Sequence, residues 1–133
     1  MMTSTNLSYA PIFSMVSLVE QCYASAYRAL EEDDLVAAHR LFGVMAAMAP
    51  RDERAWIGLA IIRERKEQWR AAAGLYGVAT AFVPTSAWCH FGKGRCLSRM
   101  GRLPDAETSY GIAEALSDDP SLLGALERER SVS

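Results

Sequence analysis

Residues 35–45, 69–79 and 103–113 read LVAAHRLFGVM, WRAAAGLYGVA and LPDAETSYGIA, and they align without gaps at a constant step of 34 residues. The residues that coincide are Ala38, Ala72 and Ala106; Phe42, Tyr76 and Tyr110; Gly43, Gly77 and Gly111; and Val44, Val78 and Ile112. The same step relates Ala26, Ala60 and Gly94 upstream, and Pro50 and Pro84 downstream. Because a fixed period of this length is the signature of repeat architectures, we expect three copies of one structural unit.

The unit resembles the tetratricopeptide repeat, a hairpin of two antiparallel helices. Its small residues would let the two helices touch, its aromatic residue would fill the gap to the next unit, and its proline would end the second helix. The expected fold class is therefore all-α, a solenoid of three tetratricopeptide-like hairpins with a C-terminal capping helix. The repeats are expected at about 19–52, 53–86 and 87–120. The seven expected helices cover 12–31, 34–48, 53–66, 68–82, 86–99, 103–117 and 120–130.

Length and composition fit one domain. The chain has 133 residues, of which 50% are hydrophobic and 23% charged, so it can bury a core. We expect a single repeat domain over 12–133 and a flexible, polar segment over 1–11. After the last repeat, Leu122, Leu123 and Leu126 form one apolar face, as expected of a helix that caps a solenoid.

Charge and hydropathy exclude two kinds of partner. The net charge of −2 lacks the basic excess of a nucleic-acid-binding protein. No apolar run approaches the roughly 18 residues that a membrane span needs, and the first basic residue is Arg28, so the charged start of a signal peptide is missing. We therefore expect no nucleic acid, no membrane span and a cytoplasmic location.

We find no pattern typical of a catalytic, metal or cofactor site. The three cysteines match no metal-ligand spacing and suit reduced thiols in a reducing compartment. Cys89 and His90 are neighbours, but adjacent helical residues point about 100° apart. The stretch Gly92-Lys93-Gly94 lacks the frame of a phosphate-binding loop. We therefore expect a binding protein, not an enzyme.

Repeats of this kind bind extended peptides in an inner groove lined by the first helix of each hairpin. The small residues Ala26, Ala60 and Gly94 are expected to face the second helix of their hairpin. Residues at helical spacing from them then lie on the neighbouring face, which lines the groove. These candidate groove residues are Tyr23, Tyr27, Leu30, Ile57, Ile61, Glu64, Trp88, Phe91 and Arg95, with Glu20 and Arg54 at the edge. Any one of the apolar residues could instead fill core. As a continuous stripe on an open face, they would need a ligand to cover them.

Four segments give the chain a closer resemblance. YASAY at 23–27, WIGLA at 56–60, LYGVA at 75–79 and GRLPDAET at 101–108 resemble the class II chaperones of bacterial type III secretion. The resemblance implies a cytoplasmic bacterial protein that binds a hydrophobic translocator, or a related secreted substrate, and keeps it soluble before export. In that family, the positions of Tyr23 and Tyr27 are aromatic and help to form the groove for a short proline-containing segment of the client.

Two alternatives stay open at this stage. The chain could be a repeat adaptor or scaffold that holds another subunit of a secretion apparatus or of an unrelated assembly. Ile12, Phe13, Val16 and Val19 could pack on the first hairpin or on a second copy of the chain, so a homodimer through the N-terminal helix is possible.

Overall fold

The computed structural model describes residues 2–132, with side chains from Met15 onward, and this part of the chain is all-α. The helices are α1 (Met2–Glu31), α2 (Leu35–Met48), α3 (Glu53–Arg65), α4 (Trp69–Phe82), α5 (Ala87–Arg99), α6 (Leu103–Leu116) and α7 (Pro120–Val132). The expected fold class and number of helices are confirmed for the described residues. From α2 to α7, every helix end lies within two residues of its expected position.

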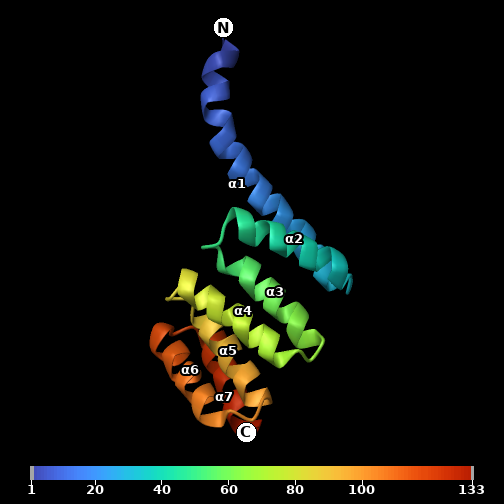
Figure 1. Cartoon of the computed structure of the whole chain (residues 1–133). Coiled ribbons are helices and arrows are strands. Elements are labelled where there is room, and N and C mark those ends of the chain that lie inside the picture. The colour runs from blue at the N-terminus through green and yellow to red at the C-terminus, as the bar shows by residue number, and fades with distance from the viewer. Residues whose placement is uncertain (1, 133) are drawn as a thin grey trace.

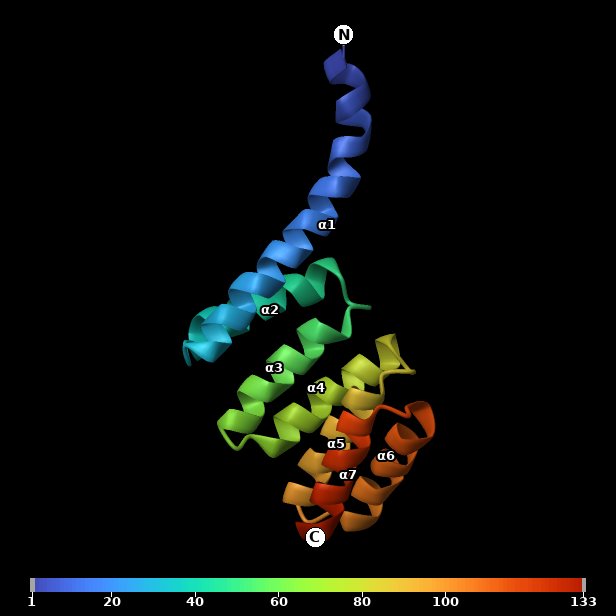
Figure 2. The ribbon, with the colours of Figure 1, turned by 180° about the vertical axis from the view of Figure 1, so that it is seen from behind.

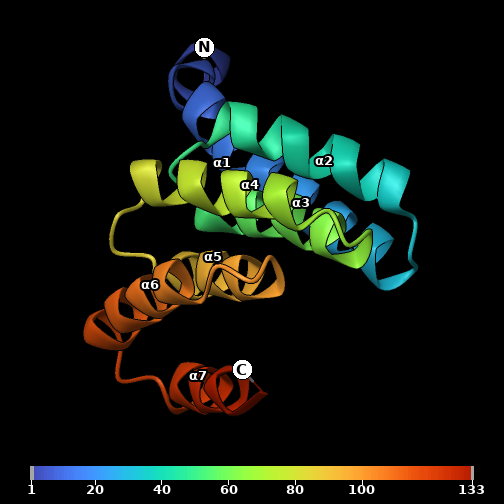
Figure 3. The ribbon, with the colours of Figure 1, turned by 60° about the horizontal axis from the view of Figure 1, so that its bottom comes forward.

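The hairpins α1/α2, α3/α4 and α5/α6 stack in chain order, and α7 closes the last of them (Figure 1). Turning the molecule brings α1, α3 and α7 to the front (Figure 2). A third view shows α7 beneath the last hairpin (Figure 3). Leu122 and Leu126 of α7 are buried, whereas Leu123, which we expected on the same apolar face, is exposed. It lies one residue beyond Leu122, so its side chain points away from the face that α7 buries.

Small residues make the close packing possible. Ala26, Ala38, Ala60 and Ala72 are fully buried. A Cβ atom added to Gly94 would lie 2.6 Å from the Tyr110 ring and 3.1 Å from the backbone oxygen of Ala106, so the two helices of the third hairpin touch at this glycine. The predicted role of small residues within the hairpins is thereby confirmed.

The repeated aromatic residues seal the contacts between successive hairpins. A Cβ atom added to Gly58 would lie 2.5 Å from the Phe42 ring, and one added to Gly92 would overlap the Tyr76 ring. Each aromatic ring therefore packs directly on the backbone of the next hairpin, which is why Phe42 and Tyr76 are only 2% exposed.

The three turns inside the hairpins share one backbone feature at the 34-residue step. Asp33, Glu67 and Gly101 all adopt the left-handed conformation, with φ of 58°, 57° and 77°. The helix that follows is capped in the first hairpin, where an Asp34 carboxylate oxygen accepts a hydrogen bond from the backbone N–H of Ala37. The turns thus repeat as regularly as the helices.

The start of α1 differs from the expectation. We expected a helix from residue 12, whereas α1 begins at Met2 and projects beyond α2 (Figure 1). The expected start rested on the apolar residues that recur at helical spacing from Ile12 onward, and the polar residues before them carry no such pattern. The flexibility of 1–11 stays a prediction, as do the domain limits. In the described part of the chain, no helix is both long and apolar enough to cross a bilayer.

Candidate functional site

The candidate residues lie on the first helices of the hairpins, but the structure exposes them unequally. Tyr27 is 49% exposed and Trp88 38% exposed, while Tyr23, Ile57 and Ile61 are partly buried. We call the surface formed by these residues, together with Arg54 and Arg95, the first-helix face. It combines open aromatic side chains with half-covered aliphatic ones, which is the composition expected of a binding surface.

Two of the predicted groove residues belong to the core. Leu30 is 7% exposed and packs with Phe42 between the first two hairpins, and Phe91 is 3% exposed and packs against Tyr110 with ring centroids 6.0 Å apart. Helical spacing placed them correctly on the first helices, yet each also reaches the second helix of a hairpin. Neither offers a surface to a ligand in this structure, so their assignment to the groove is corrected.

Tyr23 is held in place by charged neighbours at the contact between α1 and α3. The Arg54 guanidinium lies 4.2 Å from the centroid of the Tyr23 ring, within the range of a cation–π interaction. Arg54 in turn donates to Glu20 of α1 and to Asp52, both at 2.7 Å. Its hydrogen bond and charge keep the pKa of Glu20 below the ordinary value. These contacts tie α1 to α3 and fix the Tyr23 ring.

Tyr27 lies one helical turn after Tyr23, with the two ring centroids 6.0 Å apart and the planes tilted by 42°. Half of Tyr27 is open to solvent. The first-helix face therefore presents a fixed aromatic residue beside an open one. Rings of this kind supply a large contact area at a small cost in conformational entropy.

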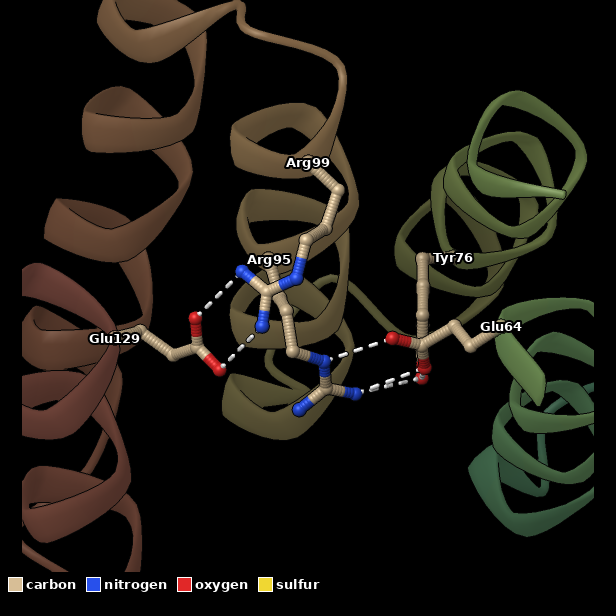
Figure 4. Close-up of polar contacts among 5 residues, drawn as sticks. All are labelled: Glu64, Tyr76, Arg95, Arg99 and Glu129. Carbon is tan, nitrogen blue, oxygen red and sulfur yellow. Dashed lines mark hydrogen bonds and ion pairs between the residues drawn. The ribbon is translucent and has the colours of Figure 1, made fainter. Parts of the chain in front are cut away.

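The contact between α3 and α5 is polar at its centre (Figure 4). The Glu64 carboxylate accepts hydrogen bonds from Arg95 Nε at 2.7 Å, from Arg95 Nη2 at 2.8 Å and from the Tyr76 hydroxyl at 2.7 Å. The side chains of Glu64 and Arg95 are 12% and 26% exposed. Burial works to lower the pKa of Arg95, but the bonds and charge of Glu64 outweigh it and raise that pKa above the ordinary value. The two predicted groove charges thus neutralise each other.

At the far end of the face, Trp88 meets Phe91 edge to face with ring centroids 5.8 Å apart. The Arg95 guanidinium lies 5.0 Å from the Phe91 centroid, so this aromatic pair adjoins the polar network. Arg99 continues the series by pairing with Glu129 of α7 at 3.0 Å (Figure 4).

Sequence reasoning listed Arg54 only as an edge residue, although the structure places it at the centre of the first contact. The sequence did indicate that Arg54 lies on the same face as Trp88, because Glu20, Arg54 and Trp88 lie at the 34-residue step. That step locates a position on the face. It does not reveal that Arg54 would turn toward Tyr23.

The three cysteines are free thiols. Cys89 and Cys96 are fully buried, and burial raises their pKa values to about 11 and about 12. Among the residues whose side chains are described, no group of three or more His, Cys, Asp or Glu could hold a metal ion.

No protein-family model matches the chain, and no curated protein matches it either. Several solved structures match it in fold. The type III secretion translocator chaperone SycD of Yersinia enterocolitica superposes with a TM-score of 0.77 at 23% identity, covering 86% of this chain and 88% of SycD. SycD in complex with a peptide of the translocator YopD gives a TM-score of 0.76 at 24% identity, covering 84% and 86%.

The first tetratricopeptide domain of Spaghetti (RPAP3), bound to the HSP90 peptide SRMEEVD, gives a TM-score of 0.74 at 11% identity, covering 87% of this chain and 93% of that one. Identities this low establish a common fold. The chain therefore has the tetratricopeptide-repeat fold, in the arrangement found in the translocator chaperone SycD.

Proposed function

We propose that the chain is a chaperone of bacterial type III secretion that works in the cytoplasm. It binds an extended segment of a hydrophobic translocator, or of a related secreted substrate, on the first-helix face and keeps it soluble before export. The observation that carries the proposal is the half-exposed ring of Tyr27 beside the Arg54-held ring of Tyr23. The structural likeness to SycD, which has been solved with a YopD peptide, supports it.

The chemistry of the face favours an apolar client. Aromatic side chains that are rigid before binding give up little conformational entropy when a ligand covers them. Ile57 and Ile61, between the tyrosines and Trp88, add half-buried aliphatic surface that a ligand can cover further. An extended segment would place alternate side chains against these residues.

The charges of the face argue against an acidic peptide tail as the ligand. Arg54 is paired with Glu20 and Asp52, and Arg95 with Glu64. Because each guanidinium already faces at least one carboxylate, its attraction for a further carboxylate is reduced. The function proposed is reversible binding and release, with no catalytic step and no cofactor.

A second candidate function is a repeat adaptor or scaffold that packs permanently against another subunit. Exposed apolar side chains at the 34-residue step on the second helices favour it. These are Val44, Val78 and Ile112, which are 50%, 41% and 41% exposed. Apolar side chains on α1 likewise support a homodimer through this helix, since Met15, Val16 and Leu18 are 52%, 61% and 49% exposed.

The test is to purify the tagged chain from its own cells and identify what accompanies it, beside Tyr27→Ala and the control Val44→Ala. The two residues are equally exposed, but Val44 lies on α2, away from the first-helix face. We expect a hydrophobic secreted protein with the wild type and with Val44→Ala, and its loss with Tyr27→Ala. Retention of the same partner by Tyr27→Ala, with loss from Val44→Ala, would favour the scaffold.

A further inference from the structure

Three equivalent positions recur at the two contacts between stacked hairpins and at the end of the last hairpin beside α7, and the chemistry at these positions changes along the chain. One position is in the last turns of a first helix, one is the repeated aromatic residue, and one is on the following first helix or on α7. At the 34-residue step the three sets are Leu30, Phe42 and Ile61; Glu64, Tyr76 and Arg95; and Ser98, Tyr110 and Glu129. We call them the first, second and third junctions.

The first junction is apolar. Leu30 and Phe42 are buried in one core cluster, and Ile61 packs against that cluster. None of these side chains can accept or donate a hydrogen bond, so contact between them has no directional requirement. Any apolar neighbour of similar size would satisfy them.

The second junction is ionic. The Glu64 carboxylate receives three hydrogen bonds of 2.7–2.8 Å, two from Arg95 and one from Tyr76 (Figure 4). Burial, together with the nearby Glu64 charge, raises the pKa of Tyr76 far above the ordinary value, so its hydroxyl stays protonated and donates. The network therefore demands its partners in a fixed order: a carboxylate on α3, a hydroxyl on α4 and a guanidinium on α5.

We propose that the Glu64–Tyr76–Arg95 network specifies which hairpin stacks on which. If α5 packed on the first hairpin in place of α3, Arg95 would lie against Leu30 and Phe42. If a second copy of α3 packed on α4 in place of α5, Glu64 and Tyr76 would lie against Ile61. Both arrangements leave a largely buried charge without its oppositely charged partner, which is energetically costly. Only the native order brings the Glu64 carboxylate, the Tyr76 hydroxyl and the Arg95 guanidinium together.

Stability alone does not explain the network. Replacing a buried ion pair by apolar residues of similar size is often neutral or stabilising, whereas removing one partner is destabilising. Repeats with interchangeable junctions would be prone to skipped stacking and to exchange of hairpins between copies. The network keeps the repeats distinguishable, and this role does not depend on which client the chain binds.

The test converts the second junction into a copy of the first with the triple substitution Glu64→Leu, Tyr76→Phe and Arg95→Ile. We expect the melting temperature to stay at or above that of the wild type. We also expect more than one set of backbone amide NMR signals, or hairpin-exchanged oligomers by size-exclusion chromatography with light scattering. The control removes the exposed Arg102–Asp105 pair, whose side chains are 57% and 54% exposed, and should behave as wild type.

A triple variant with one set of signals and the wild-type size distribution would overturn the proposal. If the triple variant does not fold, the proposal is tested by exchanging the charges of Glu64 and Arg95. Glu64→Arg and Arg95→Glu should each give mixed states, and the double reversal should restore one state. Failure of the double reversal to improve on both single variants would overturn the proposal as well.

Discussion

The ring of Tyr76 in α4 packs directly on the backbone of Gly92 in α5 and leaves no room for a side chain there. We expect Gly92→Ala to destabilise the fold by about 1–3 kcal/mol, the usual cost of an overfilled core. The measurement is urea unfolding followed by circular dichroism at 222 nm.

Gly77 is the matched control for this substitution, since a Cβ atom added there would meet nothing within 4 Å. Gly77→Ala should leave stability unchanged or raise it by up to about 1 kcal/mol, because alanine has the higher helix propensity. Equal destabilisation by the two variants would contradict the packing described here.

Glu67 adopts the left-handed conformation that its counterpart Gly101 adopts without strain. Glu67→Gly should therefore raise stability by about 0.5–1 kcal/mol, since the strain relieved exceeds the added entropy of the unfolded chain. Gly101→Ala should have the opposite effect. Thermal melts of the two variants check the prediction, and a loss of stability in Glu67→Gly would count against this turn geometry.

Cys89 and Cys96 are buried and have raised pKa values of about 11 and about 12. Iodoacetamide reacts with the thiolate, so at pH 8 these two thiols should resist alkylation in the folded protein. The partly exposed Cys22 should be modified first. Peptide mapping by mass spectrometry after timed alkylation provides the check. Early modification of Cys96 would mean that α5 is not packed as the structure has it.

The Asp52 carboxyl group makes the stability of the fold depend on pH. Hydrogen bonds from Arg54 lower the pKa of this carboxyl group in the folded state. The resulting stabilisation is fully present above the ordinary pKa of about 4 and is lost as the pH falls through the lowered value. Asp52→Asn should therefore melt below the wild type at pH 6, and the gap should close toward pH 2. A gap that stays constant with pH would contradict this role for the carboxylate.

The helices could be located from the 34-residue period because each repeated residue makes the same kind of packing contact in every hairpin. Ala38, Ala72 and Ala106 are buried where helices touch, and the aromatic residues seal the spaces between hairpins. Small residues can be recognised from spacing alone, since only they permit close approach. Gly58 and Gly92, on which these rings pack, also lie at the 34-residue step.

The candidate face was predicted less completely than the fold. Spacing assigns a residue to a helix face, but it does not decide how far a large side chain reaches inward. Leu30 and Phe91 reach the second helix of their own hairpin and are buried. The pairing of Arg54 with Tyr23 depends on a side-chain rotamer, which no periodic pattern contains.

The most direct test of the central claim is the affinity of the client's extended segment, identified by co-purification, for the wild type, Tyr27→Ala and Val44→Ala, measured by isothermal titration calorimetry. Circular dichroism of all three would establish that they fold alike. We predict that Tyr27→Ala loses about 30-fold in affinity, as expected when a central aromatic contact worth about 2 kcal/mol is removed. Val44→Ala should bind as the wild type does. Unchanged affinity of a folded Tyr27→Ala variant would contradict the account.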